Sequence, residues 1–340
     1  MARLALGLTA IFVFLLAITM ILADPFEGPA APVTRAPTAE VTLGPSVTTT
    51  SAVANLTTTP GPPRAPELGP RTSRPSPGCG RPIVTGPAIW PVTVGRIERE
   101  TRLFVPERYQ PAIATPLVLN FHGSGRTALE QETYSGLADI AEREGFLLAT
   151  PQGSGSPSGW EIPGVFNDQG GDDVEFAVAL IDSLATSHCV DLNRVYATGM
   201  SNGAEMASLL ACRRPDLIAA IAPVAGAIFD GCTAGAVSVM AFHGTFDTLV
   251  PFSGAAGDVA SWARLVGCTA QIVVERVGTD VEVRSYLGCP EGVAVVLVVS
   301  EGGGHQWPGT LTPSGGVGPV SDEIGATELM WTFFRAHRLS

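Results

Sequence analysis

Short apolar runs alternate with longer amphipathic segments along most of the chain after residue 79. The runs are four to seven residues long, which is short for helices, and they are rich in Val, Ile, Leu and Ala. Such runs are typical of strands that are buried on both faces of a parallel sheet. We therefore expect strands at residues 117–121, 146–150, 195–198, 218–224, 237–242 and 293–299.

The longer segments repeat their apolar residues at the spacing of an α-helix. Strands that alternate with such helices predict an α/β fold with a doubly wound, mostly parallel sheet and helices on both faces. In this arrangement functional residues gather at the carboxyl ends of the strands. Residues 91–105 instead predict an antiparallel pair that leads into the sheet. Helices are expected at residues 128–143, 174–186, 202–213, 257–266 and 324–334.

The first 77 residues differ in composition from the rest. Residues 1–23 carry one charge, Arg3, followed by an unbroken run of apolar or small residues, which predicts a secretory signal peptide. As a helix this run could also cross a bilayer core of about 30 Å, so a retained membrane anchor is the alternative. Residues 24–77 are rich in Pro, Thr and Ser and predict a disordered linker. We expect the folded domain at residues 78–340, secreted or held at the cell surface.

The net charge limits the partners that the protein can bind, and the cysteine content indicates the cellular compartment in which it folds. The net charge is −12 and no cluster of arginines is available to hold phosphates, which argues against nucleic acid as a partner. Six cysteines follow the linker, and an even number in an exported domain predicts three disulfides. Cys268 and Cys289 flank an expected β-hairpin region and are paired on that ground, while the other four allow three connectivities. No Cys or His cluster has the spacing of a metal site, and we expect neither a metal nor a cofactor.

A Gly-x-Ser-x-Gly sequence joins the strand expected at 195–198 to the helix expected at 202–213. A strand, a sharp turn and a helix in this order present the central serine, here Ser201, at the carboxyl edge of a sheet, where it can act as a nucleophile. In a chain with 39 glycines the pentapeptide alone is a weak signal, so its meaning depends on three further loops.

The first of these loops has the sequence FHGSG and follows the strand expected at 117–121. Glycines there let the backbone approach a substrate, and backbone N–H groups can stabilise the oxyanion that forms when a carbonyl is attacked. The candidate oxyanion hole consists of the backbone near Gly123 and Ser124, together with the N–H of Asn202 after the candidate nucleophile.

The second loop contains Asp247, five residues after the strand expected at 237–242. A buried carboxylate at this point would hold an imidazole in one tautomer and stabilise its charged form. Chain order and the strand-end position favour Asp247 over Asp230 and over three acids in an earlier loop, Asp168, Asp172 and Asp173. The last two are more simply explained as the N-terminal cap of the helix that follows them.

The third loop, GGGHQWPG, follows the last expected strand and contains His305. Its three glycines give the loop freedom to bring the imidazole over Ser201. Because a serine in such a turn takes its base from a later part of the chain, His305 is the candidate general base. Of the other histidines, His122 and His243 are expected to have structural roles, and His188 and His337 lie at helix ends.

The four motifs GMSNG, FHGSG, HGTxDxxVPF and GGGHxWPG together resemble the extracellular polyhydroxybutyrate-depolymerase-type esterases. These are related to the feruloyl and acetylxylan esterases of carbohydrate esterase family one, and the resemblance extends over residues 79–335. It implies an α/β-hydrolase fold, and it implies that Trp307 walls the pocket or braces its loop. It also implies a catalytic triad of Ser201, Asp247 and His305.

Substrate recognition is expected in the loop at 153–171, where Trp160 is a candidate contact and loop packing is its equally weighted alternative. The sequence thus predicts an exported serine esterase for polyhydroxyalkanoate oligomers or for feruloyl or acetyl esters of plant polysaccharides. One alternative is a serine peptidase of the same fold, because the triad chemistry does not separate esters from amides. The other is a non-catalytic surface-binding domain, which requires a broken triad position, and none is broken.

Overall fold

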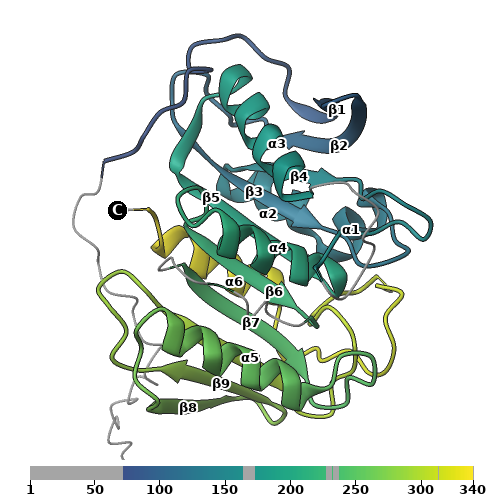
Figure 1. The fold of residues 1–340 in the computed structure, drawn as a ribbon, viewed down its shortest axis with the longest axis vertical. Helices are drawn as coiled ribbons and strands as arrows, with labels where there is room; N and C mark the ends of the chain where they lie inside the picture. The colour runs from purple at the N-terminus through teal and green to yellow at the C-terminus, as the bar shows by residue number, and fades with distance from the viewer. Residues whose placement is uncertain (1–71, 164–172, 227–231, 233–236, 313, 340) are drawn as a thin grey trace, which may run out of the picture. The chain divides into compact units, whose positions relative to one another are not determined.

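The computed structural model describes residues 72–163, 173–226, 232, 237–312 and 314–339 (Figure 1). The predicted signal or anchor segment and residues 24–71 of the predicted linker lie outside these ranges. Within them, ten strands form one sheet in the order β1-β2-β4-β3-β5-β6-β7-β10-β9-β8. The six strands from β4 to β10 pair in parallel, and antiparallel strands flank them at both ends.

All the strands expected from apolar runs are present, together with the antiparallel pair and the hairpin. The strands are β1 (Gly86–Val94), β2 (Ile97–Val105), β3 (Thr115–Phe121), β4 (Leu147–Pro151), β5 (Val190–Met200), β6 (Ala220–Val224), β7 (Ser238–Gly244), β8 (Ile272–Val277), β9 (Val281–Tyr286) and β10 (Val295–Ser300).

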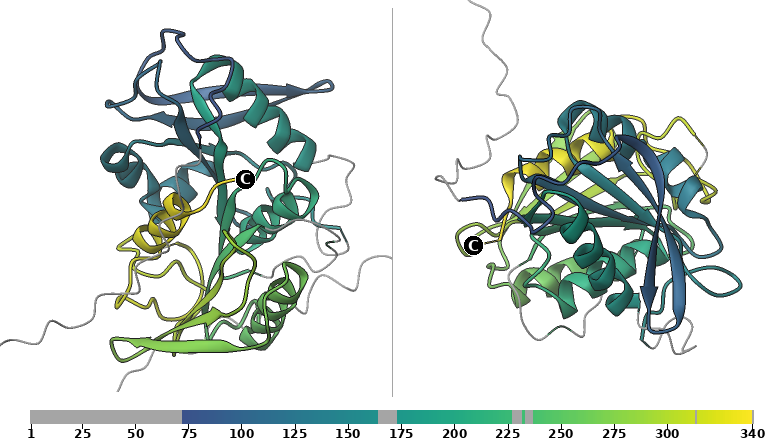
Figure 2. Two further views of the ribbon diagram at one scale, coloured as in Figure 1. Left: turned by 90° about the vertical axis from the view of Figure 1, so that its left-hand side faces the viewer. Right: turned by 90° about the horizontal axis from the view of Figure 1, so that it is seen from above.

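Helices cover both faces of the sheet, as Figure 2 shows. The helices α3, α4 and α5 share one hydrophobic core with the sheet, and α1, α2 and α6 share the other. Their bounds are α1 (Ala128–Ser135), α2 (Leu137–Glu144), α3 (Asp173–Ser187), α4 (Asn202–Arg213), α5 (Phe252–Leu265) and α6 (Ala326–Ala336).

The strand β10 shows why the central strands are apolar throughout. All six of its residues are buried. Val295, Leu297 and Val299 belong to the core beneath α5, whereas Val296 and Val298 belong to the opposite core. Successive side chains of a strand point to opposite faces, so a parallel strand between two helical layers needs apolar residues at every position.

The helix expected at 128–143 is two helices, because the chain turns at Gly136. This residue has a left-handed φ of 63° and donates its N–H to the carbonyl of Glu132, which ends α1. Tyr134, Leu137 and Ile140 are nevertheless buried in one core. The apolar spacing therefore continues across the break, which is why the pattern predicted a single helix.

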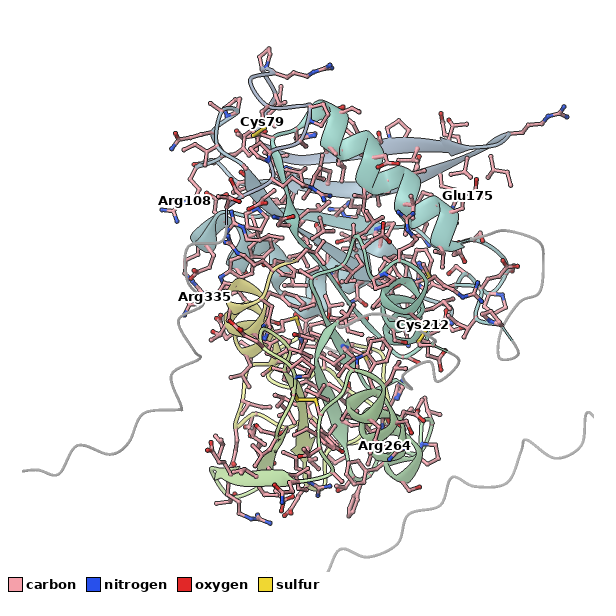
Figure 3. All side chains as sticks on the ribbon, turned by 60° about the vertical axis from the view of Figure 1, so that its left-hand side comes forward. Cys79, Arg108, Glu175, Cys212, Arg264 and Arg335 are labelled. Atoms are coloured by element: carbon pink, nitrogen blue, oxygen red, sulfur yellow. A yellow bond between two sulfur atoms is a disulfide. The ribbon has the colours of Figure 1, made fainter. Side chains whose placement is uncertain are left out.

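Three disulfides link the six cysteines, and the predicted Cys268–Cys289 pair is confirmed. The other two bonds lie at separate places in the fold, at the residues labelled Cys79 and Cys212 in Figure 3. Cys79 pairs with Cys189, and Cys212 pairs with Cys232.

The packed part of the chain begins before residue 78, the predicted domain boundary, and includes Ser76. Its hydroxyl is buried, donates to the carbonyl of His188 and accepts from the N–H of Val190. Among the helices of the described ranges, none is long and apolar enough to cross a bilayer.

We expect replacement of Leu297 by Ala to lower the free energy of unfolding by about 2–5 kcal/mol, because the side chain is fully enclosed and its removal leaves a cavity. Leu129→Ala on α1 is the matched control, since that side chain is 55% exposed and should change stability little. Thermal unfolding followed by circular dichroism measures both. Equal effects of the two substitutions would show that Leu297 is not packed in the core.

Candidate active site

Ser201 lies at the turn between β5 and α4 in a strained backbone conformation. Its φ of 56° and ψ of −124° fall in a region that residues other than glycine rarely adopt. The turn is held by a hydrogen bond of 2.9 Å from the Ser201 N–H to the carbonyl of Val224 on β6. Strained residues of this kind persist only where the surrounding structure fixes them, and they cluster at functional sites.

The two glycines of the Gly-x-Ser-x-Gly sequence are required by close contact with the end of β3. A Cβ atom at Gly199 would lie 2.5 Å from the carbonyl oxygen of Phe121, and one at Gly203 would lie 2.1 Å from the same oxygen. Real Cβ atoms do not approach oxygen so closely. The contact therefore places Ser201 next to the loop that begins at His122.

Asp247 and His305 form a buried pair. The Nδ1 atom of His305 lies 2.8 Å from Oδ2 of Asp247, and the two residues are 3% and 6% exposed. The other carboxylate oxygen, Oδ1, accepts the backbone N–H groups of Leu249 at 2.9 Å and Val250 at 2.8 Å. The loop that follows β7 thus fixes the carboxylate from both sides.

A second imidazole, that of His243, also faces the Asp247 carboxylate. Its Nε2 donates to the carbonyl of Val250 at 2.8 Å and lies 3.3 Å from Oδ2 of Asp247. Burial acts to raise the pKa of Asp247. Hydrogen bonds from His243, His305 and the Val250 N–H outweigh this effect and hold the pKa below its ordinary value. Asp247 is consequently ionised throughout the pH range in which an imidazole titrates.

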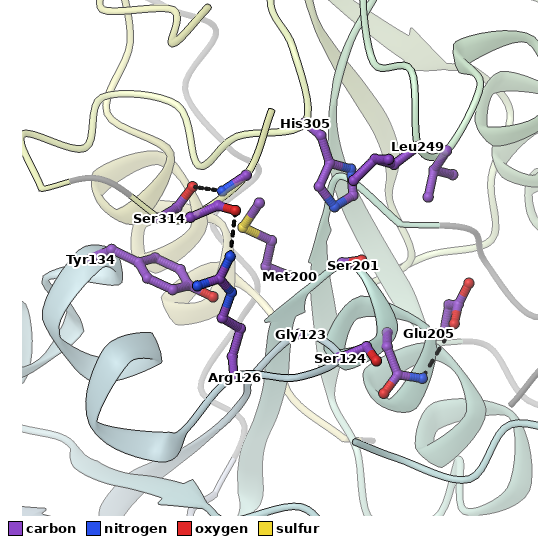
Figure 4. Close-up of a pocket in the computed structure, with 14 residues that line it drawn as sticks. Gly123, Ser124, Arg126, Tyr134, Met200, Ser201, Glu205, Leu249, His305 and Ser314 are labelled. Atoms are coloured by element: carbon purple, nitrogen blue, oxygen red, sulfur yellow. Dashed lines mark hydrogen bonds between the residues drawn. The ribbon is translucent and has the colours of Figure 1, made fainter. Parts of the chain in front are cut away.

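A cavity of about 370 Å³ brings most of the predicted site residues together. Ser201 and His305 both line it, and Figure 4 shows the His305 ring above Ser201. The three residues of the expected oxyanion hole, Gly123, Ser124 and Asn202, line it as well. Asp247 lies behind His305 and does not contribute to the wall.

Nine residues of the cavity wall were not predicted. The segment 314–316 reaches the cavity because His305 and Val317 pair across an antiparallel bridge, which folds the intervening loop back over the site. Glu205 lies one helical turn after Ser201, so the spacing of four residues could have identified it. The unpredicted residues are Arg126, Tyr134, Met200, Glu205, Leu249, Val250, Ser314, Gly315 and Gly316.

The structure corrects the expectation that Trp160 contacts substrate. Its side chain is fully buried, its indole N–H donates to the carbonyl of His122 at 2.7 Å, and it is not part of the cavity wall. Its backbone N–H donates to Oδ1 of Asn202 at 2.7 Å. Trp160 therefore packs the loop against the turn, as its alternative interpretation proposed. None of residues 153–163 lines this cavity, and residues 164–171 of the expected recognition loop lie outside the described ranges.

Trp307 is likewise buried and absent from the cavity wall, which corrects its assignment to substrate binding. Its indole N–H donates to the hydroxyl of Thr327 on α6 at 3.0 Å. Its ring packs against Tyr134, which does line the cavity. Trp307 thus braces the loop that carries His305, which was the other role expected for it.

His122 has the structural role expected for it. The imidazole is fully buried, and Nδ1 donates to the carbonyl of Gly123 at 2.8 Å while Nε2 accepts the N–H of Gly153 at 2.8 Å. Burial lowers the pKa of His122, which favours the neutral ring that these two bonds require. The residue therefore fixes the backbone of the expected oxyanion loop.

Comparison with known proteins identifies the family. Residues 103–283 match the family described as "Esterase PHB depolymerase". Feruloyl esterase B of Piromyces equi is 32% identical over 216 residues, which are 56% of this chain and only 40% of that enzyme. The probable feruloyl esterase C of Aspergillus clavatus is 28% identical over 271 residues, which are 77% of this chain and 90% of that protein. The putative esterase NocK of Nocardia uniformis subsp. tsuyamanensis is 32% identical, over 58% of this chain and 67% of that protein.

Solved structures share the fold at low sequence identity. Acetyl xylan esterase from Aspergillus awamori superposes with a TM-score of 0.57 at 16% identity, over 73% of this chain and 99% of that chain. The dienelactone hydrolase-like promiscuous phosphotriesterase P91 from metagenomic libraries gives 0.52 at 16% identity, over 74% and 98%. The fold is that of the α/β-hydrolases. Because the family match covers more than half of the sequence, the chain belongs to the esterase PHB depolymerase family, a family of carboxylic ester hydrolases.

Proposed function

We propose that this protein is an exported serine esterase in which Ser201 attacks the carbonyl carbon of a carboxylic ester. The observation that carries the proposal is the 2.8 Å contact of the Asp247 carboxylate with Nδ1 of His305, whose ring lines one cavity with Ser201. The hydrogen bond to Nδ1 holds the proton on that nitrogen, so Nε2 is the basic atom of His305. The proposed nucleophile, general base and orienting acid thus come from three separate loops at one edge of the sheet.

The proposed reaction proceeds in two halves. As the Ser201 oxygen bonds to the ester carbon, its proton passes to Nε2 of His305, and the ionised Asp247 stabilises the imidazolium. Collapse of the tetrahedral intermediate expels the alcohol, which takes the proton from His305 and leaves an acyl group on Ser201. Water then attacks the acyl carbon with His305 again as base, which releases the acid and restores Ser201.

The oxyanion of each intermediate is proposed to bind at the backbone near Gly123 and Ser124 and at the N–H of Asn202. Asn202 is the first residue of α4, so its N–H points out of the positive end of a helix dipole. Its side chain is held by Trp160, and the Gly123 carbonyl is held by His122. Donors fixed in advance stabilise developing charge without reorganising during the reaction.

The proposed substrates are hydroxyalkanoate oligomers and feruloyl or acetyl esters of plant polysaccharides. The family description and the names of the feruloyl esterase relatives support these two classes. Export is supported by the three disulfides, since such bonds persist in oxidising compartments outside the cytosol.

Ser201→Ala should reduce hydrolysis of p-nitrophenyl acetate, methyl ferulate and 3-hydroxybutyrate oligomers to background, a loss on the order of 10⁶-fold, because no other group replaces the nucleophile. It should also abolish labelling by a fluorophosphonate. Ser261→Ala on α5, whose hydroxyl bonds only within its helix, should leave both unchanged. Retained turnover in Ser201→Ala, or cleavage of peptides in preference to all the esters, would refute the proposal.

Asp247→Asn should reduce kcat by about 10³- to 10⁴-fold, because the amide no longer holds the His305 tautomer or stabilises its charge. In the wild-type protein the lowered pKa of Asp247 keeps the carboxylate ionised at pH values below those at which an ordinary aspartate is protonated. Protonation of Asp247 should therefore not contribute to the acid side of the pH profile of kcat/KM above the ordinary titration range of an aspartate. Asp216→Asn, at an exposed ion pair with Arg214, is the control. Near-normal kcat in a folded Asp247→Asn variant would contradict the role of this carboxylate.

Gly203→Ala should reduce kcat/KM about 100-fold, because its methyl group must displace the end of β3 and with it the oxyanion loop. Gly257→Ala on α5 is the matched control. A Cβ atom there meets nothing within 4 Å, and alanine favours the helix by about 0.5–1 kcal/mol. Steady-state kinetics and thermal unfolding of both variants test the contact. Full activity in Gly203→Ala would show that the close contact between residue 203 and the end of β3 is not needed for catalysis.

A further inference from the structure

The cavity beside Ser201 carries a cationic and an acidic side chain on opposite sides. Figure 4 shows Arg126 on one side of Ser201 and Glu205 on the other. Arg126 comes from the loop between β3 and α1, and Glu205 comes from the first turn of α4. An ester bound at Ser201 therefore extends toward a positive charge in one direction and toward a carboxyl group in the other.

The guanidinium of Arg126 is held in place against the cavity wall. It donates through Nη2 to the carbonyl of Gly315, and a Cβ atom at Gly315 would lie 2.2 Å from its central carbon. The main chain of Arg126 is fixed as well. Its N–H donates to the carbonyl of Gly123, and its carbonyl accepts a hydrogen bond from the Ser158 hydroxyl. This cation is thus tied to the same turn that supplies the expected oxyanion donors.

The nearby acid Glu130 pairs with Arg126 only loosely. Its Oε1 lies 3.6 Å from Nη1 of Arg126, which is longer than a hydrogen bond. The other oxygen, Oε2, accepts the N–H and the hydroxyl of Thr127 and thereby caps α1. Arg126 is 36% exposed and retains N–H groups that none of these contacts uses.

The opposite side of the cavity disfavours a negative charge. Glu205 is half-buried, and its Oε2 lies 3.5 Å from the amide nitrogen of Asn202. Burial raises the pKa of Glu205, and where this carboxyl group is ionised it repels a second anion placed beside it. A protein with a net charge of −12 also repels anions in general. Arg126 therefore places a positive charge on one side of a cavity in a protein that otherwise repels anions.

We propose that Arg126 is a specificity-determining residue that binds a carboxylate carried by the ester substrate. A planar guanidinium is suited to a carboxylate because it can donate two parallel hydrogen bonds to the two oxygens. This inference rests on the proposed esterase function and narrows its substrates. They are esters that include a free carboxylate beside the scissile bond, either the acid end of a hydroxy-acid oligomer or a uronic acid. Neutral acetyl and feruloyl esters lack this interaction.

Two pairs of substrates test the proposal in the wild-type protein. The first is the linear dimer of 3-hydroxybutyrate and its methyl ester, and the second is an O-acetylated galacturonate and its methyl ester. Each pair differs by one carboxylate. The comparison uses the ester bond that both members of a pair share. In at least one pair we expect kcat/KM to be at least about tenfold higher for the free acid than for its methyl ester. A tenfold ratio corresponds to the free energy of one charge-assisted hydrogen bond. The pair that shows the preference identifies the source of the carboxylate.

Substitutions then assign the preference to Arg126. The ratio of free acid to methyl ester should fall to about one or below in Arg126→Gln and should be partly retained in Arg126→Lys. Arg143→Gln is the matched control, because Arg143 pairs with Glu144 and Glu328 away from the cavity, and it should keep the wild-type ratio. The ratio compares two substrates on one protein, so a fall in overall activity does not affect it.

Equal kcat/KM for both members of both pairs in the wild-type protein would overturn the inference while leaving the esterase function intact. A preference that persists unchanged in Arg126→Gln would also overturn it. If the wild-type protein hydrolyses neither the acids nor the methyl esters nor p-nitrophenyl acetate, the proposed esterase function fails, and the inference fails with it.

Discussion

The close approach of the Ser201 turn to the end of β3 is the contact on which the rest of the site depends. Gly199 and Gly203 let the carbonyl of Phe121 lie where any side chain would collide with it. Because of this contact, the candidate nucleophile and the candidate oxyanion loop occupy adjacent positions at one sheet edge. The His122 ring then fixes the backbone of the oxyanion loop through hydrogen bonds to Gly123 and Gly153, and the main chain of Trp160 holds the side chain of Asn202.

Electrostatics provide a second constraint, which acts through Asp247. Its carboxylate is buried, and a buried charge is stable only when its oxygens are hydrogen-bonded. Two backbone N–H groups and two imidazoles meet this requirement. The loop after β7 therefore holds Asp247 in the position from which it orients His305. His243, which the sequence indicated only as a structural residue, is part of this arrangement.

The sequence predicted the elements of the fold well, because their causes are local or periodic. Apolar runs located the central strands, and the Cys268–Cys289 pair followed from the hairpin between them. The helix at 128–143 was wrong as a single element, since the left-handed Gly136 interrupts the backbone without interrupting the apolar spacing. The tryptophans show a related limit. For each of them the sequence left substrate contact and packing of its own loop as alternatives, and both side chains are buried against neighbouring elements.

By itself, the sequence determined the succession of strand, turn and helix around Ser201, the three loops that accompany it, and the identity of the residues with the right chemistry. Only the tertiary structure decided what surrounds them. The walls of the cavity come from segments distant in sequence, such as Arg126 and Gly315, which meet because a bridge at His305 folds the later loop back. No local sequence pattern predicts such a contact, since it results from the packing of whole elements. The charge presented to a substrate is therefore a property of the folded chain.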